Sequence, residues 1–87
     1  MESRIEVQGI YLKTMMRDLR DGFTTFLVAA QGKKIACSGT ILPIENGTKV
    51  IVQGEEEIHP VFGLQVKNAR VRKQPLDHNE LLKVILS

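Results

Sequence analysis

The side chains in this sequence that could do chemistry are basic residues and a few aromatic rings. Lysine and arginine neutralise nucleic-acid phosphates, which gives salt-dependent binding without sequence preference. The basic side chains fall into three groups, one before Gly22, one after Gly32 and one after Val66. A solvated basic rim without a ligand explains these groups equally well. Their members are Arg17, Arg20, Lys33, Lys34, Lys67, Arg70, Arg72 and Lys73.

Aromatic rings that could stack on bases are scarce. The chain has three phenylalanines, one tyrosine and no tryptophan. Phe26 is predicted to lie in the core, whereas Phe23 and Phe62 are the candidate platforms, each contributing about 1–3 kcal/mol per stacked base. With so few rings, we expect weak affinity for single-stranded DNA. The predicted nucleic-acid-binding residues are Arg17, Arg20, Phe23, Lys34, Phe62, Lys67 and Arg70.

Signatures of catalysis or metal binding are missing from the sequence. There is no G-x-x-x-x-G-K-[ST] phosphate loop. His59, His78 and Cys37 are scattered without the spacing of metal ligands, and Cys37 is predicted to be a buried, inert thiol. The run 55–57 of three glutamates is interpreted as a solvated edge. We therefore expect no catalytic residue, no metal, no cofactor and no enzyme activity in this chain.

Length and composition are those of one small domain. The 87 residues carry a formal net charge of +2, which permits a polyanionic partner without requiring one. The single cysteine, Cys37, excludes a disulfide within the chain and fits a reducing compartment. No apolar run reaches the ~20 residues of a membrane span, and the first residues lack the apolar core of a signal peptide. A cytoplasmic location without membrane contact is the simplest expectation.

Short β-rich runs separated by turn signals predict an all-β domain. The clearest element is a hairpin over 50–71, whose tip is built on His59-Pro60 and closed by Gly63. We favour a tip that packs back on the domain over one that stacks on bases. In two of these runs the apolar residues switch from one face of the strand to the other. The first switch predicts a bulge or sharp coil at Gly9, and the second predicts a bulge near 67–68. Strands are expected over 5–16, 22–30, 34–40, 49–55 and 63–72, with a connector over 41–48.

A long first strand and a break between the third and fourth strands predict a five-stranded OB-fold barrel over 1–74. An SH3-like barrel is the nearest alternative. In an OB fold, strands two and three with the first and fourth loops form the usual oligonucleotide face. Phe23 and Phe62 are expected to lie at the two loops beside that face.

The tail over 75–87 is predicted to begin a short C-terminal helix. Asp77 and Glu80 have the spacing of a capping box, and an apolar stripe follows it. Because a helix this short is unstable alone, we interpret 75–87 as a truncated helical segment that leads to a following domain. The stripe consists of Leu81, Leu82, Ile85 and Leu86.

Several motifs together resemble one protein family. They are I-E-V-Q-G-I at 5–10, D-G-F-T at 21–24, S-G-T-I-L-P at 38–43 and Q-G-E…H-P-V-F-G-L-Q-V at 53–66. The last motif is the most specific, and the tail over 74–87 also fits the pattern. The chain resembles the N-terminal OB-fold domain of RecD-like (RecD/TraA-type) ATP-dependent DNA helicases. Gly54, His59, Pro60, Phe62, Gly63 and Gln65 carry the strongest match.

The resemblance implies an accessory domain of a bacterial superfamily one helicase that moves 5′-to-3′ on DNA during repair and recombination. It implies that this domain binds or guides single-stranded DNA near the motor, and that its other partner is the rest of the helicase chain. ATP and Mg would belong to the motor of that parent protein. The alternative is a protein-protein docking module with little DNA affinity, which the sparse aromatics and low net charge favour.

Overall fold

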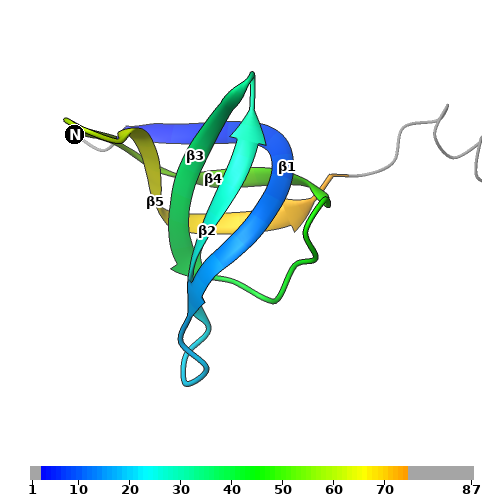
Figure 1. Cartoon of the computed structure of the whole chain (residues 1–87). Helices are drawn as coiled ribbons and strands as arrows, with labels where there is room; N and C mark the ends of the chain where they lie inside the picture. The colour runs from blue at the N-terminus through cyan, green and yellow to red at the C-terminus, as the bar shows by residue number, and fades with distance from the viewer. Residues whose placement is uncertain (1–2, 75–87) are drawn as a thin grey trace, which may run out of the picture.

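Five strands make up most of residues 3–74, the part of the chain that the computed structural model describes (Figure 1). Each lies where the sequence predicted a strand, and its ends differ from the predicted ones by at most one residue, except at the end of β4. β4 continues four residues beyond the predicted end at Glu55, because its pairing with β5 extends to His59 opposite Gly63. The strands are β1 (Arg4–Arg17), β2 (Phe23–Ala30), β3 (Lys33–Thr40), β4 (Lys49–His59) and β5 (Gly63–Lys73).

The strands close into a barrel in the order β1-β2-β3-β5-β4. β1 pairs with β4 over Arg4–Ile10 and with β2 from Ile10 onward, so one bent strand serves both sides of the barrel. All pairings are antiparallel except β3 with β5, which is parallel. The prediction of an all-β, five-stranded barrel is confirmed, and the order is consistent with an OB fold. The predicted C-terminal helix over 75–87 lies outside the described residues.

The bend in β1 has a different basis from the one predicted. Its pairing with β2 shifts register between Tyr11 and Lys13 and again after Thr14, so of the two predicted forms at Gly9 the bulge is wrong, while β1 does change partner from β4 to β2 at the next residue, Ile10. Gly9 is instead a point of close approach, because a Cβ there would lie 2.2 Å from the carbonyl oxygen of Ala29. Only glycine allows the coiled strand to come this near its neighbour.

The bulge predicted near 67–68 is confirmed. β4 and β5 shift register between Gln53 and Glu55, and Asn68 has a φ of 50°. Asparagine tolerates this left-handed conformation better than most residues. The bulge turns the second half of β5 so that Ala69 points into the barrel and is buried.

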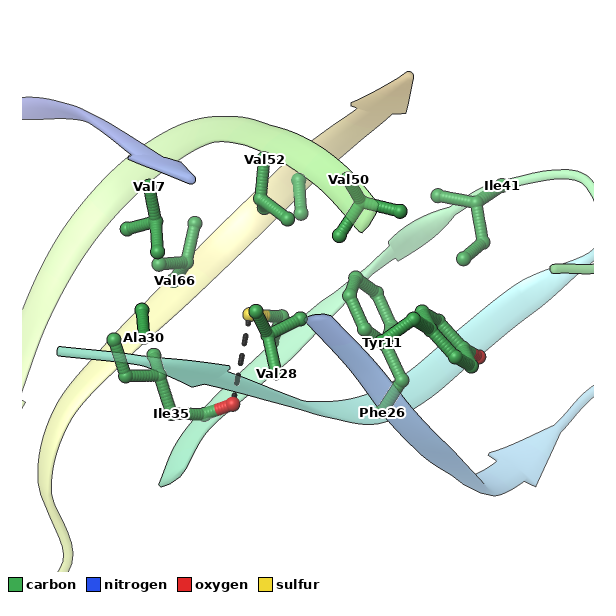
Figure 2. Close-up of a cluster of buried hydrophobic side chains, with 12 residues drawn as sticks. Val7, Tyr11, Phe26, Val28, Ala30, Ile35, Ile41, Val50, Val52 and Val66 are labelled. Carbon is green, nitrogen blue, oxygen red and sulfur yellow. Dashed lines mark hydrogen bonds between the residues drawn. The ribbon is translucent and has the colours of Figure 1, made fainter. Parts of the chain in front are cut away.

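The barrel interior is filled from all five strands (Figure 2). Alternation along β2 places Thr24, Phe26 and Val28 inside, where each is fully buried, and the predicted core position of Phe26 is confirmed. The ring of Tyr11 stacks on Phe26 with centroids 5.2 Å apart. The remaining fully buried core residues are Cys37, Val50, Val52 and Val66.

Candidate nucleic-acid interface

A shallow hollow of about 300 Å³ lies where the start of β2, the end of β3 and the middle of β5 meet. Phe23 contributes an aromatic ring that is 39% exposed, and Arg70 contributes a guanidinium group on the exposed side of β5. A ring and a cation that line one hollow are the two groups that bind a base and a phosphate. Gly39, Thr40, Asn68 and Ala69 complete the lining.

Local hydrogen bonds fix the position of Phe23. The carboxylate of Asp21 accepts a hydrogen bond of 2.9 Å from the backbone N–H of Phe23, which is the geometry of an Asx turn. The backbone N–H of Asp18 donates to the carbonyl of Phe23 at 2.8 Å. Pairing with Thr40 then places the ring beside the end of β3. Hydrogen bonds to its backbone N–H and C=O groups therefore hold Phe23 in place.

Arg70 reaches the hollow because β3 and β5 pack unusually closely at Gly39. A Cβ at Gly39 would lie 2.3 Å from the carbonyl oxygen of Ala69, so the backbones nearly touch. The β5 bulge adds Asn68, whose amide donates to Glu55 at 3.0 Å. Arg70 itself makes no ion pair with another residue of the described range 3–74, and its cross-strand neighbour is the neutral Gln53. Within residues 3–74, no carboxylate compensates the charge of Arg70.

Two other arginines lie near this end of the barrel, Arg17 at the end of β1 and Arg20 in the turn between β1 and β2. Arg17 Nη1 donates to the buried Thr24 Oγ1 at 2.9 Å, and that hydroxyl donates to the carbonyl of Gly22 at 2.9 Å. Arg20 forms a bidentate pair with Asp18, with distances of 3.2 Å and 3.0 Å. The Arg20 side chain lowers the pKa of Asp18, and the same pair raises the pKa of Arg20. The charge of Arg20 is thus largely compensated.

A comparison with protein-family models matches residues 4–75 to the family described as ATP-dependent DNA helicase YrrC, OB-fold domain. The chain belongs to this family. Searches of curated proteins and of solved structures find no match. The family agrees with the barrel topology, and it makes this chain an OB-fold domain of a kind found in a DNA helicase.

In this OB-fold domain the β4–β5 tip is separate from the hollow. Figure 1 shows the β1–β2 turn and the β4–β5 turn at different ends of the barrel, so Phe23 and Phe62 do not flank one face as expected. The predicted packing of the tip against the domain is also wrong, since Phe62 is 72% exposed. The tip is organised by His59, whose Nδ1 accepts from the N–H groups of Val61 and Phe62 at 3.0 Å and 3.1 Å. The rings of His59 and Phe62 lie 4.7 Å apart.

The structure groups only some of the predicted binding residues. Lys67 lies on β5 three positions before Arg70, but its cross-strand neighbour is the acidic Glu55. Lys34 is exposed opposite Ala29, at the end of the β2–β3 hairpin away from Phe23. Of the predicted binding residues, only Phe23 and Arg70 line the hollow, while Arg17 is the last residue of β1 and Arg20 lies in the turn between β1 and β2.

Sequence reasoning missed four residues of the hollow, namely Gly39, Thr40, Asn68 and Ala69. The predicted bulge near 67–68 was the one signal for Asn68, because a bulge redirects side chains. No signal identified the others, since their role depends on the close approach of β3 to β5.

Cys37, the single cysteine of the chain, is not placed to react. Cys37 is buried at 1% exposure, and its Sγ donates to the carbonyl of Ile35 at 3.7 Å (Figure 2). Burial raises the pKa of this thiol to about 12, so it is protonated at neutral pH. Within 3–74, histidine, cysteine and carboxylate side chains form no group of three that could hold a metal. The same residues include no helix long and apolar enough to cross a membrane.

Proposed function

We propose that this OB-fold domain binds single-stranded DNA weakly at the hollow and guides it near the motor of a helicase. The observation that carries the proposal is the presence of Phe23 and Arg70 in one hollow. We further propose that the parent is a RecD-like bacterial enzyme of superfamily one, which acts 5′-to-3′ in the cytoplasm in repair and recombination. ATP and Mg would serve its motor, outside this domain.

The hollow would hold one nucleotide at a time. The face of the Phe23 ring offers stacking to any base, and the Arg70 guanidinium can bind a phosphate oxygen, so binding is independent of sequence. A single ring limits the stacking contribution to about 1–3 kcal/mol. Weak binding suits a domain that passes a strand toward a motor rather than storing it.

A second candidate function is docking on the motor domains of the same helicase. Large apolar side chains are exposed at the β1–β2 turn and in the β3–β4 connector, and Leu19 reaches 90% exposure. Large exposed apolar patches are typical of protein interfaces. The side chains are Met15, Met16, Leu19 and Leu42.

Titration of a labelled single-stranded oligonucleotide with the 87-residue chain, at low and moderate salt, tests the DNA proposal. Reversing two charges on β5, with Lys67→Glu and Arg70→Glu, should abolish binding. The matched control reverses Lys33 and Lys34, which are exposed on β3 and do not line the hollow.

Two results contradict the DNA proposal. One is the absence of binding by the unmodified chain at high micromolar concentration in low salt. The other is an intact helicase whose DNA binding is unchanged by the β5 charge reversals. In the second case docking becomes the better explanation, and substitution of Leu19 by aspartate should then weaken contact between the domain and the motor.

A further inference from the structure

A second and larger hollow, of about 430 Å³, lies at the other end of β2 from Phe23. One wall is formed by four consecutive residues of β1, 5–8. The opposite wall is the β2–β3 hairpin at Ala30, Lys33 and Ile35, and Leu64 of β5 also lines it. The side chains of Ile5, Ala30, Ile35 and Leu64 make much of this lining apolar.

The β1 wall is a strand edge. Successive side chains in a strand point to opposite faces, so four consecutive residues can line one hollow only along their backbone. β1 pairs with β4 over Arg4–Ile10, but its pairing with β2 begins at Ile10. Among the described residues, the second edge of β1 before Ile10 therefore has no strand partner.

The opposite wall also contains a strand edge that has no described strand partner. β3 pairs with β5 at only two positions, Ala36 with Gln65 and Cys37 with Val66. Lys33–Ile35 consequently pairs with β2 on one side and with no described strand on the other. Unpaired backbone N–H and C=O groups on both walls are the groups that an extended chain can satisfy.

Charge in the hollow is unbalanced. Glu6, which also lines the hollow, accepts from Gln53 Nε2 at 3.1 Å, and its Oε1 lies 3.8 Å from Arg72 Nη2 in an exposed ion pair. Lys33 is exposed and makes no ion pair within 3–74. The hollow has no aromatic ring for base stacking. An apolar surface with one available cation and open backbone edges suits a peptide better than a nucleic acid.

We propose that this hollow binds an extended peptide of a partner protein by strand addition to β1. The peptide would pair its backbone with residues 5–8 and turn alternate apolar side chains toward Ile35 and Leu64. A glutamate or aspartate in the peptide would pair with Lys33. This site is independent of the DNA hollow, since the two lie at opposite ends of the β2–β3 hairpin.

The probe is a soluble peptide of about seven residues in which valine and threonine alternate, with a glutamate near one end, matching strand addition. It is titrated into the ¹⁵N-labelled 87-residue chain and followed by NMR. We expect shifts of the amides of Ile5–Gln8 and Ile35, and slower hydrogen exchange along 5–8. The control peptide is N-methylated at alternate amides, which removes the backbone donors, and should bind at least about tenfold more weakly.

A pair of neighbouring variants separates the site from general charge. Lys33→Glu should weaken the peptide several-fold, whereas Lys34→Glu makes the same charge change outside the hollow and should not. Equal binding of the methylated peptide, or shifts confined to Phe23 and Arg70, would overturn the proposal. So would amides of 5–8 that are already protected before peptide is added, because the chain itself would then cover the edge.

Discussion

Phe23 on β2 and Arg70 on β5 line the same hollow although their strands do not pair with each other. β3 lies between them, and its last residues are small enough for the two outer strands to approach. The closest point is Gly39, where the β3 backbone nearly touches Ala69 of β5. The relation between ring and cation therefore depends on a glycine, which lines the hollow but has no side chain to bind a base or a phosphate.

Replacing Gly39 by alanine should destabilise the domain. The new methyl group would lie 2.3 Å from the Ala69 oxygen and 2.7 Å from the Ala69 nitrogen, and these backbone atoms cannot move aside easily. Overpacking of this kind costs about 1–3 kcal/mol. Urea unfolding followed by circular dichroism measures the loss. The control is Thr40→Ala on the next residue, and equal stability of both variants would show that the close approach is not real.

Replacing Thr24 by valine tests the anchor of the β1–β2 turn. Valine fills the same buried space but cannot accept from Arg17 or donate to the carbonyl of Gly22. We expect a loss of about 1–3 kcal/mol in unfolding free energy, because the buried hydroxyl makes two hydrogen bonds, each contributing about 0.5–1.5 kcal/mol. Thr25→Val, on the outward face of β2, is the matched control. A Thr24→Val domain as stable as the control would contradict this role.

The two arginines near the hollow should differ in their effect on DNA binding. Arg70→Ala removes an uncompensated charge, so the dependence of log K on log salt should become shallower by about 0.7 for single-stranded DNA. Arg20→Ala should change the slope less, because Asp18 already compensates that charge. Fluorescence titrations over a range of salt concentrations measure both slopes. A larger change with Arg20→Ala would place the phosphate contact on the turn instead.

Alkaline pH should unfold the domain through Cys37. The folded-state pKa of about 12 lies above the ordinary value of 9.0, so the unfolded chain loses its thiol proton first. Stability from this group is fully present below pH 9.0 and is lost as pH rises toward about 12. Chemical unfolding at several pH values measures the slope. Cys37→Ala should remove this part of it, and an identical slope in both proteins would contradict the assignment.

The sequence was sufficient to predict most of the barrel. Alternating apolar residues gave β2, with Thr24, Phe26 and Val28 inside, and turn residues placed the strand ends. The bulge in β5 was predicted from a switch of its apolar residues from one face of the strand to the other. The β1 bulges were not predicted, because the switch of apolar residues in β1 was assigned to Gly9, whereas the register shifts lie after Tyr11 and after Thr14 and Gly9 is a point of contact with Ala29.

Less of the candidate site than of the barrel could be predicted from the sequence. Residue type identified Phe23 and Arg70 as binding candidates but could not show that they meet, because their proximity depends on the parallel β3–β5 contact. The same reasoning grouped Phe62 with Phe23 on the pattern of a generic OB fold. The β4–β5 turn, which contains Phe62, instead lies at a different end of the barrel from the β1–β2 turn (Figure 1).

The central claim is that single-stranded DNA stacks on Phe23 in the hollow. A labelled oligothymidine titrated into Phe23→Ala and Phe62→Ala tests it most directly, since both variants remove one exposed phenylalanine from the same domain. Loss of one stacked base should weaken Phe23→Ala by roughly 5- to 150-fold, while Phe62→Ala should stay within about twofold of the unmodified chain. Weakening by Phe62→Ala alone, with Phe23→Ala unaffected, would contradict the account and move the DNA site to the β4–β5 tip.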